Sequence, residues 1–155
     1  MSVIEARLKE LGVTLPAPPV PVASYVPFAI SGNIVFISGQ VPIADGAVKY
    51  VAKLGIDGGV EVGQAAAQLC AINVLAQLKA ACGGDLDRVT RCLKLGVFVN
   101  ATPDFTQQPE VANGASDLIA AVFGDAGKHA RFAVGSSNLP MNVPVEVDAV
   151  FALRG

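Results

Sequence analysis

Residues 130–153, ARFAVGSSNLPMNVPVEVDAVFAL, decide the fold class of this chain. Apolar residues flank a polar, proline-containing centre, a pattern that predicts a strand, a turn and a second strand. The segment is almost free of charge, yet it carries Arg131, Glu146 and Asp148. An isolated charge in an apolar strand costs several kcal/mol unless it is paired or used. We therefore interpret the segment as a small site that holds an organic acid beside a carboxylate.

The hairpin prediction also suggests which charges share a face. Glu146 and Asp148 are two residues apart in a strand and so lie on the same face. If Arg131 lies opposite Glu146, the centre of the hairpin falls between Asn138 and Leu139, inside the predicted turn. This register places the arginine and the glutamate on one face, although a slip of one residue would separate them. The alternative interpretation of the two carboxylates is a solvated outer strand face.

The composition indicates a globular chain with an apolar surface to cover. Its 155 residues are enough for one domain, and 52% of them are hydrophobic while only 15% are charged. Strands that are apolar on both faces need cover on both faces, which favours a homo-oligomer. The net charge of -2 gives no electrostatic support for binding nucleic acid.

The chain carries no pattern that predicts secretion, a membrane span or a metal site. Its start, MSVIEARLKELGV, is charged and amphipathic, and no apolar run approaches about 18 residues. Cys70, Cys82 and Cys92 are odd in number and lack CxxC spacing, which predicts reduced thiols in a cytoplasmic protein. His129 is the only histidine, so no histidine-based metal cluster is expected, and a peripheral role at the site stays open.

Hydrophobic periodicity and turn residues predict the order of elements. The predicted helices cover residues 3–11, 60–81 and 110–123, a polar loop covers 100–109, and the strands cover 25–30, 33–38, part of 44–51, 89–99 and both arms of 130–153. Two main helices on one face of a mostly antiparallel or mixed sheet form an α+β sandwich. The proline-rich stretch 15–23 favours extended chain. We therefore expect residues 1–20 to form a helix and an arm, and residues 21–155 to form one domain.

A second candidate site lies at the end of the strand 33–38, where Ser38 precedes Gly39. Glycine there lets the backbone bend or lets a ligand approach closely, and a plain structural strand end is the alternative. Ser38 has no histidine partner evident in the sequence, which argues against a Ser-His-Asp hydrolase.

Several blocks resemble the Rid family, also called YjgF-like and, in older usage, endoribonuclease L-PSP. The resemblance rests on Tyr25, SGQVPI (38–43), GGDLDRV (83–89), VFVN (97–100) and ARFAVGSSNLPMNVPVEVDAV (130–150), and it covers about residues 20–153. The long N-terminus is similar to that of one subgroup. The resemblance implies a chorismate-mutase-like fold and a homotrimer with three clefts between subunits.

The resemblance also implies an activity: hydrolytic deamination of reactive 2-imino or enamine acids, such as 2-aminoacrylate and 2-iminopropionate, to 2-keto acids and ammonia. Members are known as 2-iminobutanoate/2-iminopropanoate deaminases and need no metal or organic cofactor. By resemblance, Arg131 binds the substrate carboxylate and Glu146 positions the water, which leaves Asp148 a structural role. The positions that would line the cleft are Tyr25, Ser38, Gly39, Asn113 and Ala133.

Two departures from the family pattern bear on the pocket. Ala133 replaces a residue that is often cysteine, so only its backbone groups can serve, and Phe132 replaces a commonly small residue. The alternative functions are a non-catalytic, small-carboxylate-binding regulatory trimer and a ribonuclease. The net negative charge of the chain and its single histidine argue against the ribonuclease.

Overall fold

A computed structural model describes residues 2–18 and 24–155. Within these residues the helices and strands are α1 (Val3–Glu10), β1 (Phe28–Ser31), β2 (Ile34–Gln40), β3 (Ile43–Ala44), β4 (Ala47–Val48), α2 (Val60–Ala81), β5 (Val89–Asn100), α3 (Gln108–Phe123), β6 (Ala130–Ser136) and β7 (Val145–Leu153). The predicted extended segment 15–23 is described as far as Pro18, where it forms neither helix nor strand, and residues 19–23 lie outside the description.

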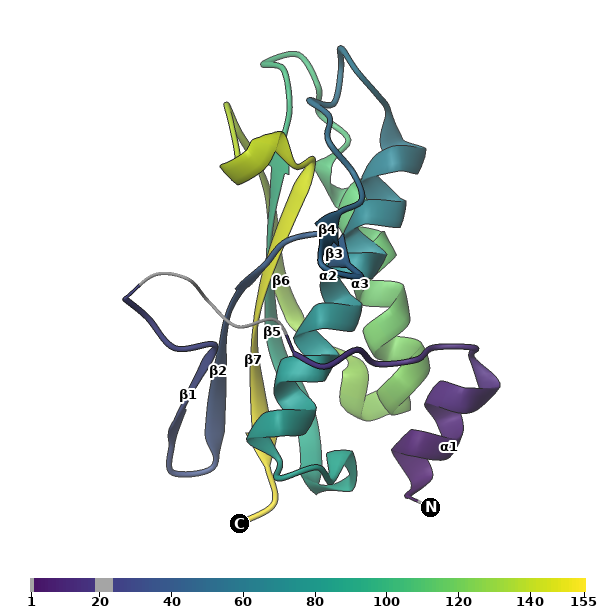
Figure 1. Ribbon diagram of the computed structural model, residues 1–155, viewed down its shortest axis with the longest axis vertical. Coiled ribbons are helices and arrows are strands. Elements are labelled where there is room, and N and C mark those ends of the chain that lie inside the picture. The colour runs from purple at the N-terminus through teal and green to yellow at the C-terminus, as the bar shows by residue number, and fades with distance from the viewer. Residues whose placement is uncertain (1, 19–23) are drawn as a thin grey trace.

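The predicted α+β sandwich is confirmed. The five strands of the main sheet follow the order β1-β2-β7-β5-β6, with β5 and β6 parallel and the other pairs antiparallel. Both main helices, α2 and α3, cover one face of this sheet (Figure 1). Alternate residues of β7, from Val145 to Leu153, are buried against them, while Glu146 and Asp148 lie on the other face.

The helix layer follows from small residues in the sequence. α2 begins and ends where the periodicity predicts, and the left-handed residues Gly83 (φ 64°) and Gly84 (φ 95°) stop it. In α3, a side chain at Gly114 would overlap the backbone of Gln64 in α2. The two helices therefore pack at backbone contact. None of the described helices is long and apolar enough to cross a membrane.

The prediction that residues 130–153 form a hairpin is wrong. β6 pairs in parallel with β5, where Arg131 lies opposite Leu95, and β7 pairs in antiparallel with β5, where Glu146 lies opposite Phe98. β5 thus separates the two strands that the sequence predicts to be neighbours. The cause is the β5–α3–β6 crossover, the kind of connection that parallel neighbours require.

The connection from β6 to β7 crosses the end of β5, and Asn100 holds it there. This loop, residues 137–144, is longer than the roughly 2–5 residues of a usual hairpin loop. Asn100 Nδ2 lies 2.9 Å from Asn142 Oδ1 and 3.1 Å from Val143 O, and the Asn100 amide donates to Pro144 O at 2.9 Å. Asn100 is fully buried, so the predicted polar loop 100–109 begins one residue too early.

The sheet face opposite the helices is apolar and partly exposed. Phe36 is 52% exposed, Phe98 36% and Val134 42%, and no helix in the described part of the chain lies over them (Figure 1). We call this surface the open face. A second copy of the chain is the cover that the composition predicts for it.

The N-terminal helix is held by a carboxylate from another part of the chain. Ser2 caps α1, and Asp87 accepts hydrogen bonds from the Val3 and Ile4 amides, each at 3.0 Å. The Ile4 amide is the main reason that the pKa of Asp87 lies below its ordinary value of 3.8. Leu8 then inserts into the core with 2% exposure.

We expect Asp87→Ala to release α1 at neutral pH without unfolding the sheet. Hydrogen exchange should accelerate over residues 3–10 and stay unchanged in β5 and β7. Because the folded-state pKa of Asp87 is lowered, its contribution is complete above the ordinary carboxyl pKa and is lost as pH falls through the lowered value. Acidifying the wild-type chain should therefore reproduce the variant, and unchanged exchange in Asp87→Ala would contradict this role.

Candidate functional site

The predicted site residues form two groups on opposite faces of the sheet. Arg131, Asn113 and Ala133 lie on the helix side of β6, and we call them the arginine half-site. Glu146 and Gly39 meet on the open face, next to Ser38, and we call these the glutamate half-site.

The arginine half-site presents a guanidinium that α3 already holds. Arg131 Nη1 donates to Asn113 Oδ1 at 2.9 Å and to Ser116 Oγ at 3.0 Å, and Nη2 lies 3.5 Å from Pro109 O. Nothing in the described residues accepts from the Nε–H group, and one Nη2–H is also left. Adjacent Nε–H and Nη2–H donors are the pair with which an arginine grips a carboxylate bidentately.

Two neighbours of Arg131 on β6 point in different directions. Ala133 lies on the same face as Arg131 and packs against the core, so its backbone is what it offers a ligand. Phe132 lies on the open face, where its ring contacts the Phe98 ring at a centroid distance of 5.2 Å and Lys94 Nζ at 5.2 Å. Within one chain, Phe132 does not narrow the space around the guanidinium.

The glutamate half-site depends on a bulge in β2. The pairing of β2 with β7 shifts register between Ile37 and Gln40, which places Gly39 beneath the Glu146 carboxylate. A side chain at Gly39 would place its Cβ 2.9 Å from Glu146 Oε2. Ser38 Oγ donates to Val26 O at 2.7 Å and so fixes the segment that carries Tyr25, which is 55% exposed.

The two carboxylates of β7 have different environments. Burial, and then the charge of Asp148, raise the pKa of Glu146, which forms no hydrogen bond with the described residues. Burial also raises the pKa of Asp148, but the Gly96 amide and the charge of Lys94 oppose this shift. Glu146 is thus the carboxylate available to hold a water and accept a proton.

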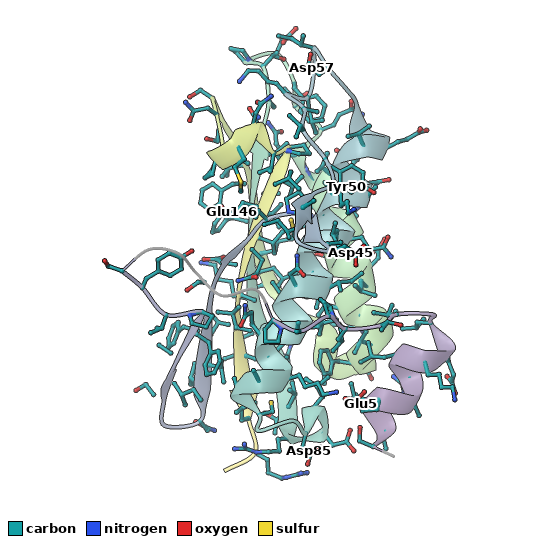
Figure 2. The ribbon with its side chains drawn as sticks, viewed as in Figure 1. Glu5, Asp45, Tyr50, Asp57, Asp85 and Glu146 are labelled. Carbon is teal, nitrogen blue, oxygen red and sulfur yellow. The ribbon has the colours of Figure 1, made fainter. Side chains whose placement is uncertain are left out.

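A single chain does not bring Arg131 and Glu146 together. Both Glu146 on β7 and Val134 on β6 lie opposite Phe98 of β5, so Glu146 and Val134 share a face. Arg131 is three residues from Val134, and this odd number places the Arg131 and Glu146 side chains on opposite faces. Two strand spacings and three residues along the strand separate their Cα atoms by roughly 14 Å. Figure 2 shows Glu146 on the side of the sheet away from α2 and α3.

A cleft of about 350 Å³ lies further along the helix face of β6, at Gly135. Gln108, next to the Pro109 carbonyl that contacts Arg131, forms part of its wall, and Lys53 stands at its side. None of the predicted site residues lines this cleft. Residues 2–18 and 24–155 contain no group of three side chains that could hold a metal ion.

We expect Gly39→Ala to displace the Glu146 carboxylate while leaving the fold intact. The glycine has no left-handed φ, and the obstructing atom is the end of a flexible side chain, so the free energy of unfolding should change by less than about 1 kcal/mol. Any reaction that uses Glu146 as a base should slow about tenfold or more. Gly59→Ala, where a side chain meets nothing within 4 Å, is the matched control. Equal kcat in the two variants would contradict the role of Gly39.

The profile of a known family matches nearly the whole chain. The family is described as "YjgF/chorismate mutase-like, putative endoribonuclease", and the match covers residues 5–152. The chain belongs to this family.

This YjgF-like chain matches its relatives over nearly their whole length. Protein TCP17 of Trypanosoma cruzi is 50% identical over 152 residues, which are 97% of this chain and 94% of that protein. The crystal structure of Atu1372 from Agrobacterium tumefaciens, described as of unknown function, has a TM-score of 0.91 at 51% identity and covers 97% of this chain and 92% of that one. A "putative endoribonuclease" from Shewanella oneidensis has a TM-score of 0.94 at 34% identity, with 98% and 100% covered.

The structure adds two residues to the arginine half-site of this YjgF-like chain: Ser116, which the sequence does not predict, and His129, for which the sequence left a peripheral role open. Ser116 contacts Arg131, and His129 Nε2 lies 2.9 Å from Ser116 Oγ. Ser116 stands three residues after Asn113 in α3, a spacing that places both on one helix face. That spacing is the signal that could have indicated Ser116 once Asn113 was assigned to the site.

Proposed function

We propose that the chain forms a homotrimer that hydrolyses 2-imino and enamine acids to 2-keto acids and ammonia. Each active cleft would lie between two copies, with Arg131 from one and Glu146 from the next. One observation carries the proposal: a guanidinium with free donors and a carboxylate without hydrogen bonds lie on opposite faces of one chain. Side chains that face away from each other in one copy can meet only at a contact between copies.

The chemistry needs only what these two groups supply. Arg131 would bind the carboxylate and so orient the imine carbon. Glu146 would take a proton from water as the water oxygen bonds to that carbon, and would pass it to nitrogen to give a carbinolamine. It would then move the carbinolamine hydroxyl proton to nitrogen as the carbon–nitrogen bond breaks, which releases ammonia and leaves the keto acid. An enamine would first gain a proton on carbon and lose one from nitrogen, and so become the imine. Water, the imine and the enzyme account for all atoms, so the protein would need no cofactor.

The open face supports the assembly. Phe36 and Phe98 flank the glutamate half-site on β2 and β5, and their exposure would end if another copy covered them. Exclusion of water from the cleft would strengthen both the arginine and the glutamate interactions. The buried, unpaired Cys70, Cys82 and Cys92 support a cytoplasmic location.

We expect keto-acid release from 2-aminoacrylate, generated in situ, to exceed the spontaneous rate, and Arg131→Ala to abolish the excess. Because Glu146 acts as a base and its pKa is raised, kcat/KM should fall as pH drops through that raised value, starting above the ordinary carboxyl pKa of 4.5. Glu146→Gln should remove this dependence along with most of the rate. A wild-type rate equal to the spontaneous rate would exclude the reaction.

The second candidate is a trimer that binds a small carboxylate and regulates a partner. The arginine half-site is complete in one chain without Glu146, which is what carboxylate binding alone requires. Stabilisation by a keto acid without imine turnover would favour this function. The name of the Shewanella oneidensis relative suggests RNA cleavage. To assign that activity to this site, the purified chain would have to cleave RNA, and Arg131→Ala or Glu146→Gln would have to abolish the cleavage.

A further inference from the structure

A chain of hydrogen bonds runs from Arg131 to a backbone carbonyl. Arg131 Nη1 lies 3.0 Å from Ser116 Oγ, which lies 2.9 Å from His129 Nε2. His129 Nδ1 in turn lies 2.6 Å from Gly127 O. Ser116 belongs to α3 and His129 immediately precedes β6, so these bonds join the helix to the strand that carries the arginine. The proposed reaction gives neither residue a role.

The direction of each bond follows from the donors and acceptors. The Gly127 carbonyl can only accept, so His129 carries a hydrogen on Nδ1. In the neutral ring Nε2 is then an acceptor, and the Ser116 hydroxyl donates to it. The same hydroxyl oxygen accepts from Arg131 Nη1. For the neutral ring, only the Nδ1–H tautomer satisfies all three contacts.

This arrangement fixes the plane of the guanidinium. Nη1 has two hydrogens, and Asn113 Oδ1 and Ser116 Oγ, both on α3, accept one each. A planar group held at two points of one nitrogen cannot turn about its own axis without breaking a charge-assisted hydrogen bond. The Nε–H and Nη2–H donors are therefore presented in a constant direction.

We propose that Ser116 and His129 are positioning residues that hold Arg131 in the orientation in which it receives a substrate carboxylate, an inference that rests on the proposed function. Ser116 contacts the arginine and His129 contacts Ser116, so both act on the substrate only through Arg131. Removing the Ser116 hydroxyl leaves one Nη1–H without an acceptor and His129 Nε2 without a donor, so that Asn113 alone holds Nη1 and the plane of the guanidinium is less firmly fixed. The loss falls on acid binding, because the water-activating Glu146 is not touched.

The first test reads His129 in the free protein, without any ligand. His129 is the only histidine, so nitrogen-15 NMR of the labelled chain reports its tautomer without assignment. Above neutral pH we expect the Nδ1–H form in the wild-type chain and a mixture of tautomers in Ser116→Ala. A wild-type ring in the Nε2–H form overturns the inference.

The second test measures the dissociation constant of pyruvate, a stable 2-keto acid, together with KM and kcat for the imine. Ser116→Ala and His129→Asn should raise Kd and KM about tenfold and change kcat by less than about twofold. Ser116→Thr and His129→Gln, which restore a group at the Oγ and Nε2 positions, should regain most of the affinity. Gln64→Ala, which removes a hydrogen bond from α2 to the Glu110 carbonyl of α3, the helix that carries Ser116, is the control and should not alter binding.

The outcomes separate this inference from the proposed function. Wild-type turnover with unchanged Kd and KM in Ser116→Ala and His129→Asn overturns the positioning role and leaves the deaminase intact. Pyruvate binding that depends on Arg131 and Ser116 in a chain that does not hydrolyse imines supports the positioning role and excludes the deaminase. A wild-type chain that does not bind pyruvate overturns both.

Discussion

An equimolar mixture of Arg131→Ala and Glu146→Gln chains should regain imine hydrolysis that neither variant shows alone. Each variant lacks one half-site in every cleft, and removal of a group that orients the substrate or activates water costs about a hundredfold or more. In mixed oligomers, a cleft that takes Arg131 from one variant and Glu146 from the other is intact. Random mixing gives about a quarter of the clefts this composition.

The measurement is the initial rate of keto-acid release after the two variants are unfolded together and refolded. The double variant Arg131→Ala/Glu146→Gln, mixed with wild-type chains, controls for refolding losses. Recovery is expected because the two side chains face opposite sides of one chain. A mixture as inactive as its components would mean that the half-sites do not work across copies, and the proposed cleft would be wrong.

Replacing Asn100 by leucine should lower the free energy of unfolding by about 3–4 kcal/mol. The side chain is fully buried, its Nδ2 lies within 3.1 Å of Ala52 O, Asn142 Oδ1 and Val143 O, and its Oδ1 accepts from Lys53 at 3.2 Å. Leucine has a similar volume but leaves these groups without their partner. Each buried group so left costs about 1–3 kcal/mol, and some will reach water.

Urea unfolding measures this loss, with Asn33→Leu as the matched control. Asn33 is an exposed asparagine whose side chain donates one hydrogen bond, to Leu153 O at 3.2 Å. Its replacement should cost less than about 1 kcal/mol. Equal losses in the two variants would show that the loop from β6 to β7 does not depend on Asn100.

Local patterns predicted the elements well, because each rests on residues close in sequence. The helix over residues 60–81 has the predicted ends, since strong helix formers fill it and two glycines stop it. The Asp45-Gly46 turn likewise joins two short strands, β3 and β4, with both residues in the left-handed region. The sandwich followed from the order of these elements.

Strand pairing was not predictable in the same way. The charged strand residues and the proline-containing turn of 130–153 fit a hairpin in which Arg131 faces Glu146. The distant β5 decides the arrangement, because it forms hydrogen bonds with β6 along one edge and with β7 along the other. The length of the loop, residues 137–144, was the local indication against a tight hairpin.

The candidate site was predictable as a set of residues but not as a geometry. Arg131 and Asn113, assigned by resemblance, do meet at 2.9 Å, and Glu146 lies over Gly39. Their division between two faces depends on register, which a single sequence leaves open. Ser116 was not predicted because a hydroxyl carries no pattern until the fold places it beside the guanidinium. For His129 the sequence left a peripheral role open, and the fold places it against Ser116.

The place of β7 in the sheet has a consequence for how the molecule is made. β7 is the last strand in sequence, yet it lies between β2 and β5, so until it is synthesised the main sheet exists as two separate pairs of strands. The arginine half-site, which comes from residues 109–133, can form without β7. The glutamate half-site cannot, because Gly39 and Glu146 are far apart in sequence and meet only when β7 enters. The strand that is made last therefore both closes the main sheet at its centre and completes the glutamate half-site.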